Sequence, residues 1–492
     1  MKLFAFILYF AVVLGIGVYF FLRTKSASSK DYFLGGRSMG PWVTAMSAQA
    51  SDMSGWLLMG FPGSIVAFGF GKMWIGIGLA LGTIANWILV ARRLRRFSVA
   101  AGDSITIPEY LSNRFASKNP ALRIVCAVVF LICFTLYVAS AFAAGKELFI
   151  DVLPSLADKP NLAMFIFAVI LISYTFLGGF KAVCYTDFFQ GIMMLVAILA
   201  VPIIILFTKN LDFGAINSGF EGTANYFVSN PFSATPQDII SGLAWGLGYF
   251  GMPHILVRFM GIRKASMVKK SATVASVWVV LSLGAAILIA LFGRLLHPEL
   301  IANGTQETVF IVLSNDLFPP FIAGVLLSAI LAAAMSTADS QLLVASSSFT
   351  SDIYKTVFRR KASDKEELWI GRCVVIIVAV VAYFIAANPN CGGIMDLVGN
   401  AWAGFGAAFG PVILLSLFWR RLTYAGAITG IITGIVTDVL WLNFLSEKTG
   451  IYEIVPGFIV CLIAAVAVSL IGPKPSKEVT DIFDAATSAV EE

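Results

Sequence analysis

Charged residues are scarce in this sequence. Asp, Glu, Lys and Arg together make up only 13% of the 492 residues, whereas a soluble domain of ordinary composition carries about 25%. Hydrophobic residues account for 59%, and the mean hydropathy is +0.88. A chain with so little charge cannot face water over most of its surface. A soluble enzyme or binding domain is therefore excluded, and a single membrane domain over residues 1–492 is expected.

Histidines and paired cysteines are also rare. The chain has two histidines and six cysteines, and no two cysteines form a C-x-x-C pair. The scattered cysteines predict small apolar side chains and neither a disulfide framework nor a metal site. An intramembrane enzyme would need a base beside a serine nucleophile. His297 is expected in an outer loop and His254 near the cytoplasmic end of its span, so an enzyme is not predicted.

The net charge of +6 does not indicate a nucleic-acid partner. The basic residues stand in short clusters between apolar runs and form no stripe interleaved with aromatic residues. This distribution is typical of the cytoplasmic loops of a membrane protein. The lipid bilayer is the expected surrounding, and no obligatory protein partner is indicated.

Apolar runs long enough to cross a bilayer recur along the whole chain. Crossing about 30 Å of hydrocarbon takes about 20 residues of helix. The predicted fold class is therefore an all-α polytopic membrane protein with about thirteen transmembrane helices. The predicted spans are 3–22, 41–61, 71–91, 122–145, 161–178, 186–207, 237–256, 272–293, 317–345, 370–387, 395–418, 423–443 and 453–472.

The basic residues also predict the orientation of the chain. Most of the 34 lysines and arginines, Arg258 among them, fall on one set of alternate loops, which the positive-inside rule places in the cytoplasm. The N-terminus is thus expected outside a bacterial inner membrane and the C-terminus inside, which requires an odd number of spans. The tail, 473–492, is expected to be cytoplasmic and solvated. The outer segment 212–238 is interpreted either as a lid over the outer mouth or as a mere connector.

Polar residues interrupt the second predicted span. Ser47–Trp56 places Asp52, three serines and Gly55 inside an otherwise apolar run. Polar groups at that depth are costly and usually functional. Gly55 weakens the helix, and an unwound turn would expose carbonyl oxygens, which suit a small hard cation. The alternative is a close helix contact built on small residues, which leaves Asp52 unexplained.

Two later spans carry comparable interruptions. Trp245–Pro253 holds three glycines and a proline, so a straight helix is not expected, and its aromatic residues would wall a small apolar ligand. In the ninth span, Ser336, Asp339 and Ser340 share one helix face. Adjacent hydroxyls followed by an acid would suit a sodium site.

The second and seventh spans are both interrupted and lie five spans apart, so they cross the membrane in opposite directions. This order predicts two inverted five-helix repeats with broken first helices and a site at mid-membrane between them. The predicted divisions are an extra N-terminal helix and loop (1–37), repeat 1 (38–207), repeat 2 (236–420), two C-terminal helices (421–472) and the tail (473–492).

Several motifs resemble those of one transporter family. From about residue 5 to 472 the chain is similar to the sodium:solute symporter family, and most closely to its bacterial sodium/proline symporters. The motifs nearest to the proline members are the Ser-Asp-Met-Ser-Gly-Trp stretch and the Gly-Tyr-Phe-Gly-x-Pro-His stretch. The matching segments are Asp31–Ser38, Ser51–Gly60, Gly246–Gly251, Pro253–Ile255, Met335–Thr337 and Ala401–Pro411.

The resemblance implies secondary active transport by alternating access, in which inward sodium flow drives the uptake of L-proline. Sodium would be the only cofactor. Asp52 would govern sodium binding or coupling, and Arg37 would affect coupling from the cytoplasmic side. The implied sodium ligands are Ala50, Met53, Ala333, Ser336 and Thr337. The implied proline-binding residues are Ser54, Gly55, Trp56, Tyr137, Trp245, Tyr249 and Pro253.

Asp339 departs from the pattern of the proline members, which can carry a plain small polar residue at its position. With Asp187 and Ser340 it resembles the second sodium site of sialic-acid members, so the stoichiometry stays open. Asp339 could instead pair with a cytoplasmic Lys or Arg, or simply be reached by water from the inside.

Other transport and sensor functions are less favoured. A channel would need a ring of repeated pore-lining sites, and a membrane sensor would carry a long cytoplasmic extension. The serious alternative is a sodium symporter for another small solute, such as pantothenate, choline or a sugar.

Overall fold

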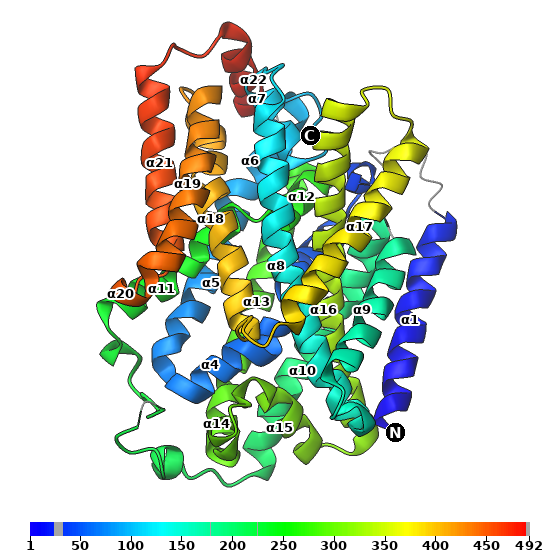
Figure 1. The fold of residues 1–492 in the computed structure, drawn as a ribbon, viewed down its shortest axis with the longest axis vertical. Coiled ribbons are helices and arrows are strands. Elements are labelled where there is room, and N and C mark those ends of the chain that lie inside the picture. Colours follow the sequence, from blue (N-terminus) through cyan, green and yellow to red (C-terminus); the bar gives the residue numbers. More distant parts are fainter. Residues whose placement is uncertain (24–32, 178, 224, 489–492) are drawn as a thin grey trace.

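The computed structural model describes residues 1–23, 33–177, 179–223 and 225–488, and over these residues it is helical without a β-strand. The helices pack side by side along the long axis of the molecule (Figure 1). Helices α18, α19 and α21 lie together at one side and α1 at the other, with the N-terminus and the last described helix, α22, toward opposite ends (Figure 1). Part of the predicted loop in 1–37, the end of span 161–178 and the end of the tail 473–492 fall outside the described residues.

Ten helical segments of the described residues are long and apolar enough to span a membrane, and a bent pair adds an eleventh. The bent pair is α11 with α12, which meet at 43°. The predicted spans 41–61 and 161–178 correspond to shorter or broken helices, so the count of thirteen is not confirmed. The long helices are α1 (Lys2–Arg23), α5 (Met73–Ala85) with α6 (Arg92–Ala100), α8 (Ala121–Val152), α10 (Phe180–Thr208), α13 (Val268–Leu296), α16 (Pro320–Ser347), α17 (Asp364–Ala387), α18 (Ile394–Phe418), α19 (Tyr424–Phe444) and α21 (Ile454–Ile471).

The second predicted span is broken where the sequence places Asp52 and Gly55. Helix α3 (Pro41–Asp52) ends when Met53 leaves the helical region at φ −81° and ψ 79°. A π-helical turn, η2 (Trp56–Gly60), then leads into α4 (Phe61–Phe68). A Cβ atom on Gly55 would lie 2.7 Å from the Cβ of Ala144 in α8. Glycine is therefore needed here because α8 packs directly against the break.

The seventh predicted span is broken as well. It consists of α11 (Pro236–Ala244), the tight helical turn η8 (Trp245–Phe250) and α12 (Pro253–Gly261). Pro253 occupies the first turn of α12, where its missing N–H costs no hydrogen bond. A Cβ on Gly251 would overlap the Phe405 carbonyl of α18. The glycines thus allow α18 to lie against the bend.

The ninth predicted span is not broken. Helix α16 runs without interruption from Pro320 to Ser347 and continues as a π-helix, η11 (Ser348–Phe358). The polar residues that suggested an interruption are fully buried in its middle. Their hydroxyls are satisfied by hydrogen bonds to carbonyl groups or to other side chains, so the helix does not need to unwind.

The sequence suggested a solvated tail, but the structure shows a helix that packs on the rest of the protein. It forms α22 (Lys477–Ser488), whose Val479, Phe483 and Ala486 make one buried apolar face. The ring of Phe483 lies 5.3 Å from that of Phe97 in α6, and Arg114 of α7 (Ile107–Arg114) donates to the Val479 carbonyl at 3.1 Å. The mixed charge of the tail concealed this amphipathic pattern.

The segment 212–238, which the sequence predicted to lie outside, is fastened to the body of the protein over its described residues. The buried Arg294 of α13 donates to the carbonyls of Ile216 and Asn225 and to that of Val66 in α4. The segment therefore lies against the C-terminal ends of α4 and α13. The short helices α9 (Pro160–Leu177), α14 (Glu299–Ala302), α15 (Val309–Leu317) and α20 (Ser446–Thr449) complete the described fold.

Candidate functional site

Four of the five predicted sodium ligands meet between α3 and α16. The hydroxyl of Ser336 donates to the Ala50 carbonyl at 2.7 Å and to the Ala333 carbonyl at 3.3 Å. Thr337 donates to the same Ala50 carbonyl at 3.3 Å. All of these residues are buried. Neutral carbonyl and hydroxyl oxygens of this kind are hard ligands suited to a small cation. Met53, the fifth, lies at the break, where its N–H donates to the Gln49 carbonyl.

Asp52 joins the two helix breaks. Its buried carboxylate accepts a 2.5 Å hydrogen bond from the hydroxyl of Tyr249 in η8, and its second oxygen has no hydrogen-bond partner among the described residues. Its backbone carbonyl accepts from the Trp56 indole at 3.0 Å and from the Tyr137 hydroxyl at 3.2 Å. The carboxylate is thus bound to η8 and not to Ser336 or Thr337 of α16.

A layer of aromatic rings lies beside Asp52. The ring of Trp402 from α18 is 4.9 Å from that of Tyr249, edge to face, and its indole donates to the Trp245 carbonyl at 2.7 Å. Trp245 stacks on Tyr452 at 5.1 Å, and Tyr452 donates to the Gly399 carbonyl at 2.7 Å. Sequence reasoning named Trp245 and Tyr249 but missed Trp402 and Tyr452. A tryptophan in a glycine-rich span was a usable signal for Trp402, whereas Tyr452 follows a polar loop that carries no such signal.

The other predicted substrate residues lie at or next to the breaks. Ser54 and Gly55 form the break of α3, and the ring of Trp56 packs edge to face on Phe61. Pro253 begins α12. Tyr137 of α8 reaches the Asp52 carbonyl, so residues distant in sequence are brought together here.

His254 lies closer to this region than the sequence suggested. It follows the bend directly, at the second position of α12, and is fully buried. Its ring is 5.7 Å from that of Phe134 and 6.4 Å from that of Tyr137. The predicted span ended at residue 256, which put His254 near its end. In the structure α12 continues to Gly261, so that placement was wrong.

A cavity of about 430 Å³ leads to the aromatic layer from the end of the molecule where α20 lies. Its lining includes Trp245, Gly399 and Tyr452, and also Lys72 and Asp238. The stacked Trp245 and Tyr452 border this cavity, whereas Tyr249 and Asp52 do not line it. The cavity residues are Gly71, Lys72, Ile75, Asp238, Ser241, Gly242, Trp245, Met395, Asp396, Gly399, Asn400, Leu442, Ser446, Glu447, Gly450, Ile451, Tyr452 and Glu453.

The three residues of the predicted second sodium site gather around Arg258. Arg258 of α12 forms an ion pair with Asp187 of α10 at 3.2 Å and donates to the hydroxyl of Ser340. Ser340 in turn donates to Asp339 at 3.2 Å, and Ser47 donates to Asp187 at 2.7 Å. Arg258 is buried inside α12, so its sequence-based placement in a cytoplasmic loop was wrong. Asp187 has the basic partner; Asp339 contacts it only through Ser340.

Arg37 fastens the other end of α12. Its guanidinium donates to the Met260 carbonyl, to Asp103 at 2.8 Å, to Ser98 at 3.1 Å and to the Ser104 carbonyl at 2.9 Å. It thereby ties the turn η1 (Gly35–Arg37) to α6, to the loop that follows α6 and to the end of α12. It does not contact Asp52 or the sodium ligands.

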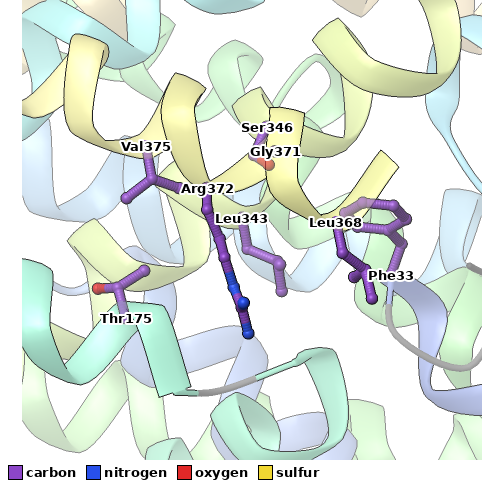
Figure 2. A pocket seen from close by; sticks show the side chains of 8 residues that line it. All are labelled: Phe33, Thr175, Leu343, Ser346, Leu368, Gly371, Arg372 and Val375. Atoms are coloured by element: carbon purple, nitrogen blue, oxygen red, sulfur yellow. The ribbon is translucent and has the colours of Figure 1, made fainter. Parts of the chain in front are cut away.

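A second pocket lies between α9, α16 and α17 (Figure 2). The side chain of Arg372 and the hydroxyl of Ser346 are among the groups that line it (Figure 2). Its volume is only about 10 Å³, about the size of a single water-sized probe. This pocket is therefore too small for an amino acid.

Comparison with known proteins shows which family the chain resembles. The sodium:solute symporter family profile matches residues 32–434. The high-affinity proline transporter PutP of Bacillus subtilis is 46% identical and the osmoregulated proline transporter OpuE of the same organism 44%, over 95% and 97% of this chain and 98% and 96% of theirs. The sodium/proline symporter of Haemophilus influenzae is 43% identical over 100% of this chain and 98% of its own.

Solved structures share the fold. A sodium-coupled sialic acid symporter in an outward-open state superposes with a TM-score of 0.76 at 21% identity, covering 96% of this chain and 98% of its own. Mhp1, a nucleobase-cation-symport-1 family transporter, gives 0.56 at 16% identity, covering 94% and 99%. The chain is a multi-pass membrane protein that belongs to the sodium:solute symporter family.

Proposed function

We propose that this protein couples the inward flow of sodium to the uptake of L-proline across a bacterial cell membrane. The observation that carries the proposal is the junction at the two helix breaks. There the Ala50 carbonyl meets the hydroxyls of Ser336 and Thr337, while Asp52 of the same helix end binds Tyr249. One helix end thus contributes both to a cation site and to an aromatic site. The family and the three proline-transporting relatives support proline as the substrate.

Sodium is proposed to bind between α3 and α16 through the carbonyls of Ala50, Met53 and Ala333 and the hydroxyls of Ser336 and Thr337. A sodium ion bound at this site would lie beside the end of α3, so its binding would affect the geometry of the helix break. Asp52 contributes a negative charge nearby that favours a cation. Its 2.5 Å hydrogen bond to Tyr249 would carry that effect to the second broken helix.

Proline is proposed to bind next to these groups, against Trp56, Tyr137, Trp245 and Tyr249. Its ring is small and apolar, so it suits a wall of aromatic rings. The stacked Trp245 and Tyr452 close this region toward the cavity. Ser54, Gly55 and Pro253 provide the irregular backbone, whose unpaired polar groups can meet a carboxylate or an ammonium group.

Alternating access requires closure at both ends of the site. Arg258 joins α12 to α10 and α16 through Asp187 and Ser340, and Arg37 ties the end of α12 to α6. These contacts form the proposed inner closure. The proposed orientation places the N-terminus outside and the C-terminus in the cytoplasm. Residues 38–207 and 236–420 are proposed as the inverted repeats whose relative movement opens each side in turn.

The test is uptake of radiolabelled proline into proteoliposomes that contain the purified protein. Uptake above the level of protein-free vesicles should require an inward sodium gradient, and unlabelled analogues with ring and carboxylate intact should compete. Choline, sugars and pantothenate should not compete; competition by one of them would favour the alternative solute. Equal uptake in a potassium gradient would overturn the sodium assignment.

A further inference from the structure

A buried acid in α19 plays no part in the mechanism described above. Asp438 stands within the span Tyr424–Phe444, is only 3% exposed, and has one carboxyl oxygen without a hydrogen-bond partner among the described residues. A charged carboxylate at such a position is costly unless it is paired. Asp438 must therefore hold a proton, a cation or a hydrogen-bond donor for part of the time.

Three neighbouring helices make room for this side chain. A Cβ on Gly404 of α18 would lie 3.8 Å from an Asp438 carboxyl oxygen and 2.9 Å from the sulfur of Cys133 in α8. A Cβ on Gly457 of α21 would lie 3.4 Å from that of Asp438. The carboxyl group is therefore held at the junction of α8, α18 and α21, behind the aromatic layer.

A second acid connects this junction to the outer cavity. Glu453 immediately precedes the span Ile454–Ile471, is 3% exposed, and lines the cavity next to Tyr452. Its charge acts on Asp438 and on Tyr452. Burial raises the pKa of Glu453 to about 7. Neither acid forms an ion pair with a described residue, so two carboxyl groups share this region without a basic partner.

The surrounding groups favour a proton over a metal ion as the occupant. A hard cation needs a shell of several oxygen ligands, whereas the groups that meet Asp438 beside Gly404 are the Cys133 sulfur and a methyl group of Ile435, and beside Gly457 a single carbonyl, that of Gly434. A proton needs only one acceptor. The charged or titratable groups around the pair are Cys133 of α8, Tyr452 beside Glu453, with Tyr137 of α8 acting on Tyr452, and the cavity residues Lys72, Asp238, Asp396 and Glu447.

We propose that Asp438 and Glu453 form a proton-binding site, open to the outer cavity through Glu453, whose proton holds the Trp245–Tyr452 stack closed. This inference rests on the proposed function in that the stack is the outer closure of the substrate site. When both acids are ionised, two like charges repel across the packed helices α19 and α21. Separation of these helices moves Tyr452, which immediately precedes Glu453, away from Trp245.

The direction of the pH effect follows from the raised pKa of Glu453. An acid whose pKa is raised in one conformation stabilises that conformation at low pH and stops doing so as the pH rises through the raised value. The closed stack should therefore be favoured below about pH 7 and lost above it. Once the pH exceeds the pKa, the ratio of open to closed protein should rise by up to about tenfold per pH unit.

The first experiment detects the proton directly, in purified protein without proline. An infrared difference spectrum between about pH 6 and about pH 8.5 should contain the band of a buried protonated carboxyl group. The band should disappear in Asp438→Asn and Glu453→Gln and persist in Glu447→Gln, which alters an acid on the same cavity wall. Absence of the band from the unmodified protein would overturn the proposal, as would its loss on adding sodium at constant pH.

The second experiment measures opening of the stack. A cysteine at Thr83, which is buried near Tyr249 and does not line the cavity, and one at the exposed Ser233 are labelled in separate proteins that carry Cys373→Ser and Cys391→Ser. The labelling rate of Thr83→Cys, divided by that of Ser233→Cys, should rise with pH around pH 7. The rise should vanish with Asp438→Asn. A flat ratio in the unmodified chain would overturn the proposal.

Neither measurement involves proline. Failure of proline uptake would therefore contradict the proposed function alone, and failure of these two tests would contradict the proton site alone.

Discussion

Asp52 and Asp187 are both fully buried acids on helices that face the centre of the protein, yet they are held in different ways. Asp187 forms an ion pair with Arg258 at 3.2 Å and also accepts from Ser47. Asp52 has no basic partner among the described residues, and its carboxylate receives only the hydroxyl of Tyr249. The chain thus supplies a permanent cation to one acid and a neutral donor to the other.

This difference separates two tasks. A buried charge without a counter-charge is costly, so Asp52 gains most when a transported cation arrives nearby. Asp187 is already neutralised by Arg258, and this pair joins α10 to α12 without a sodium ion. Asp52 is therefore expected to govern sodium dependence, whereas Arg258 and Asp187 are expected to govern the integrity of the inner closure.

The largest effect is expected from Arg258→Met. Removing one partner of a buried ion pair leaves the other charge uncompensated, at a cost of about 3–5 kcal/mol. Thermal unfolding of the purified protein should show this loss, and proline uptake should fall with it. Asp187→Asn added to Arg258→Met should restore much of the stability, because no unpaired charge remains.

Arg420→Met serves as the control for Arg258→Met, since Arg420 is exposed and pairs with Asp484 of the tail helix. Its stability should change little. If Arg258→Met unfolded at the same temperature as the unmodified protein, Asp187 would not depend on Arg258, and the contrast with Asp52 would fail.

The second prediction concerns Asp52→Asn. The substitution keeps the shape of the side chain and removes the charge, so the sodium concentration for half-maximal proline uptake should rise by on the order of tenfold or more. The unfolding temperature should change much less than in Arg258→Met. Unchanged sodium dependence in a stable, well-expressed Asp52→Asn protein would make Asp52 a structural residue.

The apolar runs predicted most of the helices because a span needs about 20 such residues whatever its neighbours are. Helix ends were less predictable. Helix α6 contains the basic cluster that follows Ala91 and ends at Ala100, because a helix can continue into water beyond its last apolar residue. The break at Met53 was predictable because glycine, serines and an acid cluster there within one short stretch.

The parts of the site that depend on packing between distant spans were not predictable. Trp402, Tyr452 and Arg258 meet the predicted residues only once α18, α21 and α12 are in place. Asp438 could have been found, since an acid stands alone in an apolar span. His254 was misplaced because its position depends on where the bend lies. Sequence therefore located the local motifs, and the structure added their long-range partners.

A smaller effect is expected from Tyr249→Phe, which keeps the ring and removes the one side-chain donor that the described residues supply to the Asp52 carboxylate. The sodium requirement should rise, but by less than in Asp52→Asn. In the double variant the two effects should not add, because both remove one interaction. Tyr452→Phe is the matched control: its hydroxyl donates to the Gly399 carbonyl in the same aromatic layer, and sodium dependence should stay as in the unmodified protein. Additive effects would show that Tyr249 acts independently of Asp52.

The smallest expected change tests whether Asp339 makes the inner cluster a second sodium site. Asp187 and Asp339 carry two negative charges when ionised, and Arg258 supplies one positive charge, so one further cation would balance the cluster. One oxygen of each acid lacks a hydrogen-bond partner among the described residues. Against this, Arg258 already pairs with Asp187, and among the described residues Ser340 connects it to Asp339.

Proline is a neutral zwitterion, so each sodium adds one charge per transport cycle, worth about 2.3 kcal/mol per 100 mV. Reversal-potential measurements in proteoliposomes give that number of charges directly. We expect a single charge per proline, unchanged by Asp339→Ser, because Arg258 stands in for a second ion. A ratio of two charges per proline that falls to one in Asp339→Ser would instead place a transported sodium ion in the cluster. The contrast between Asp187 and Asp52 would then no longer hold.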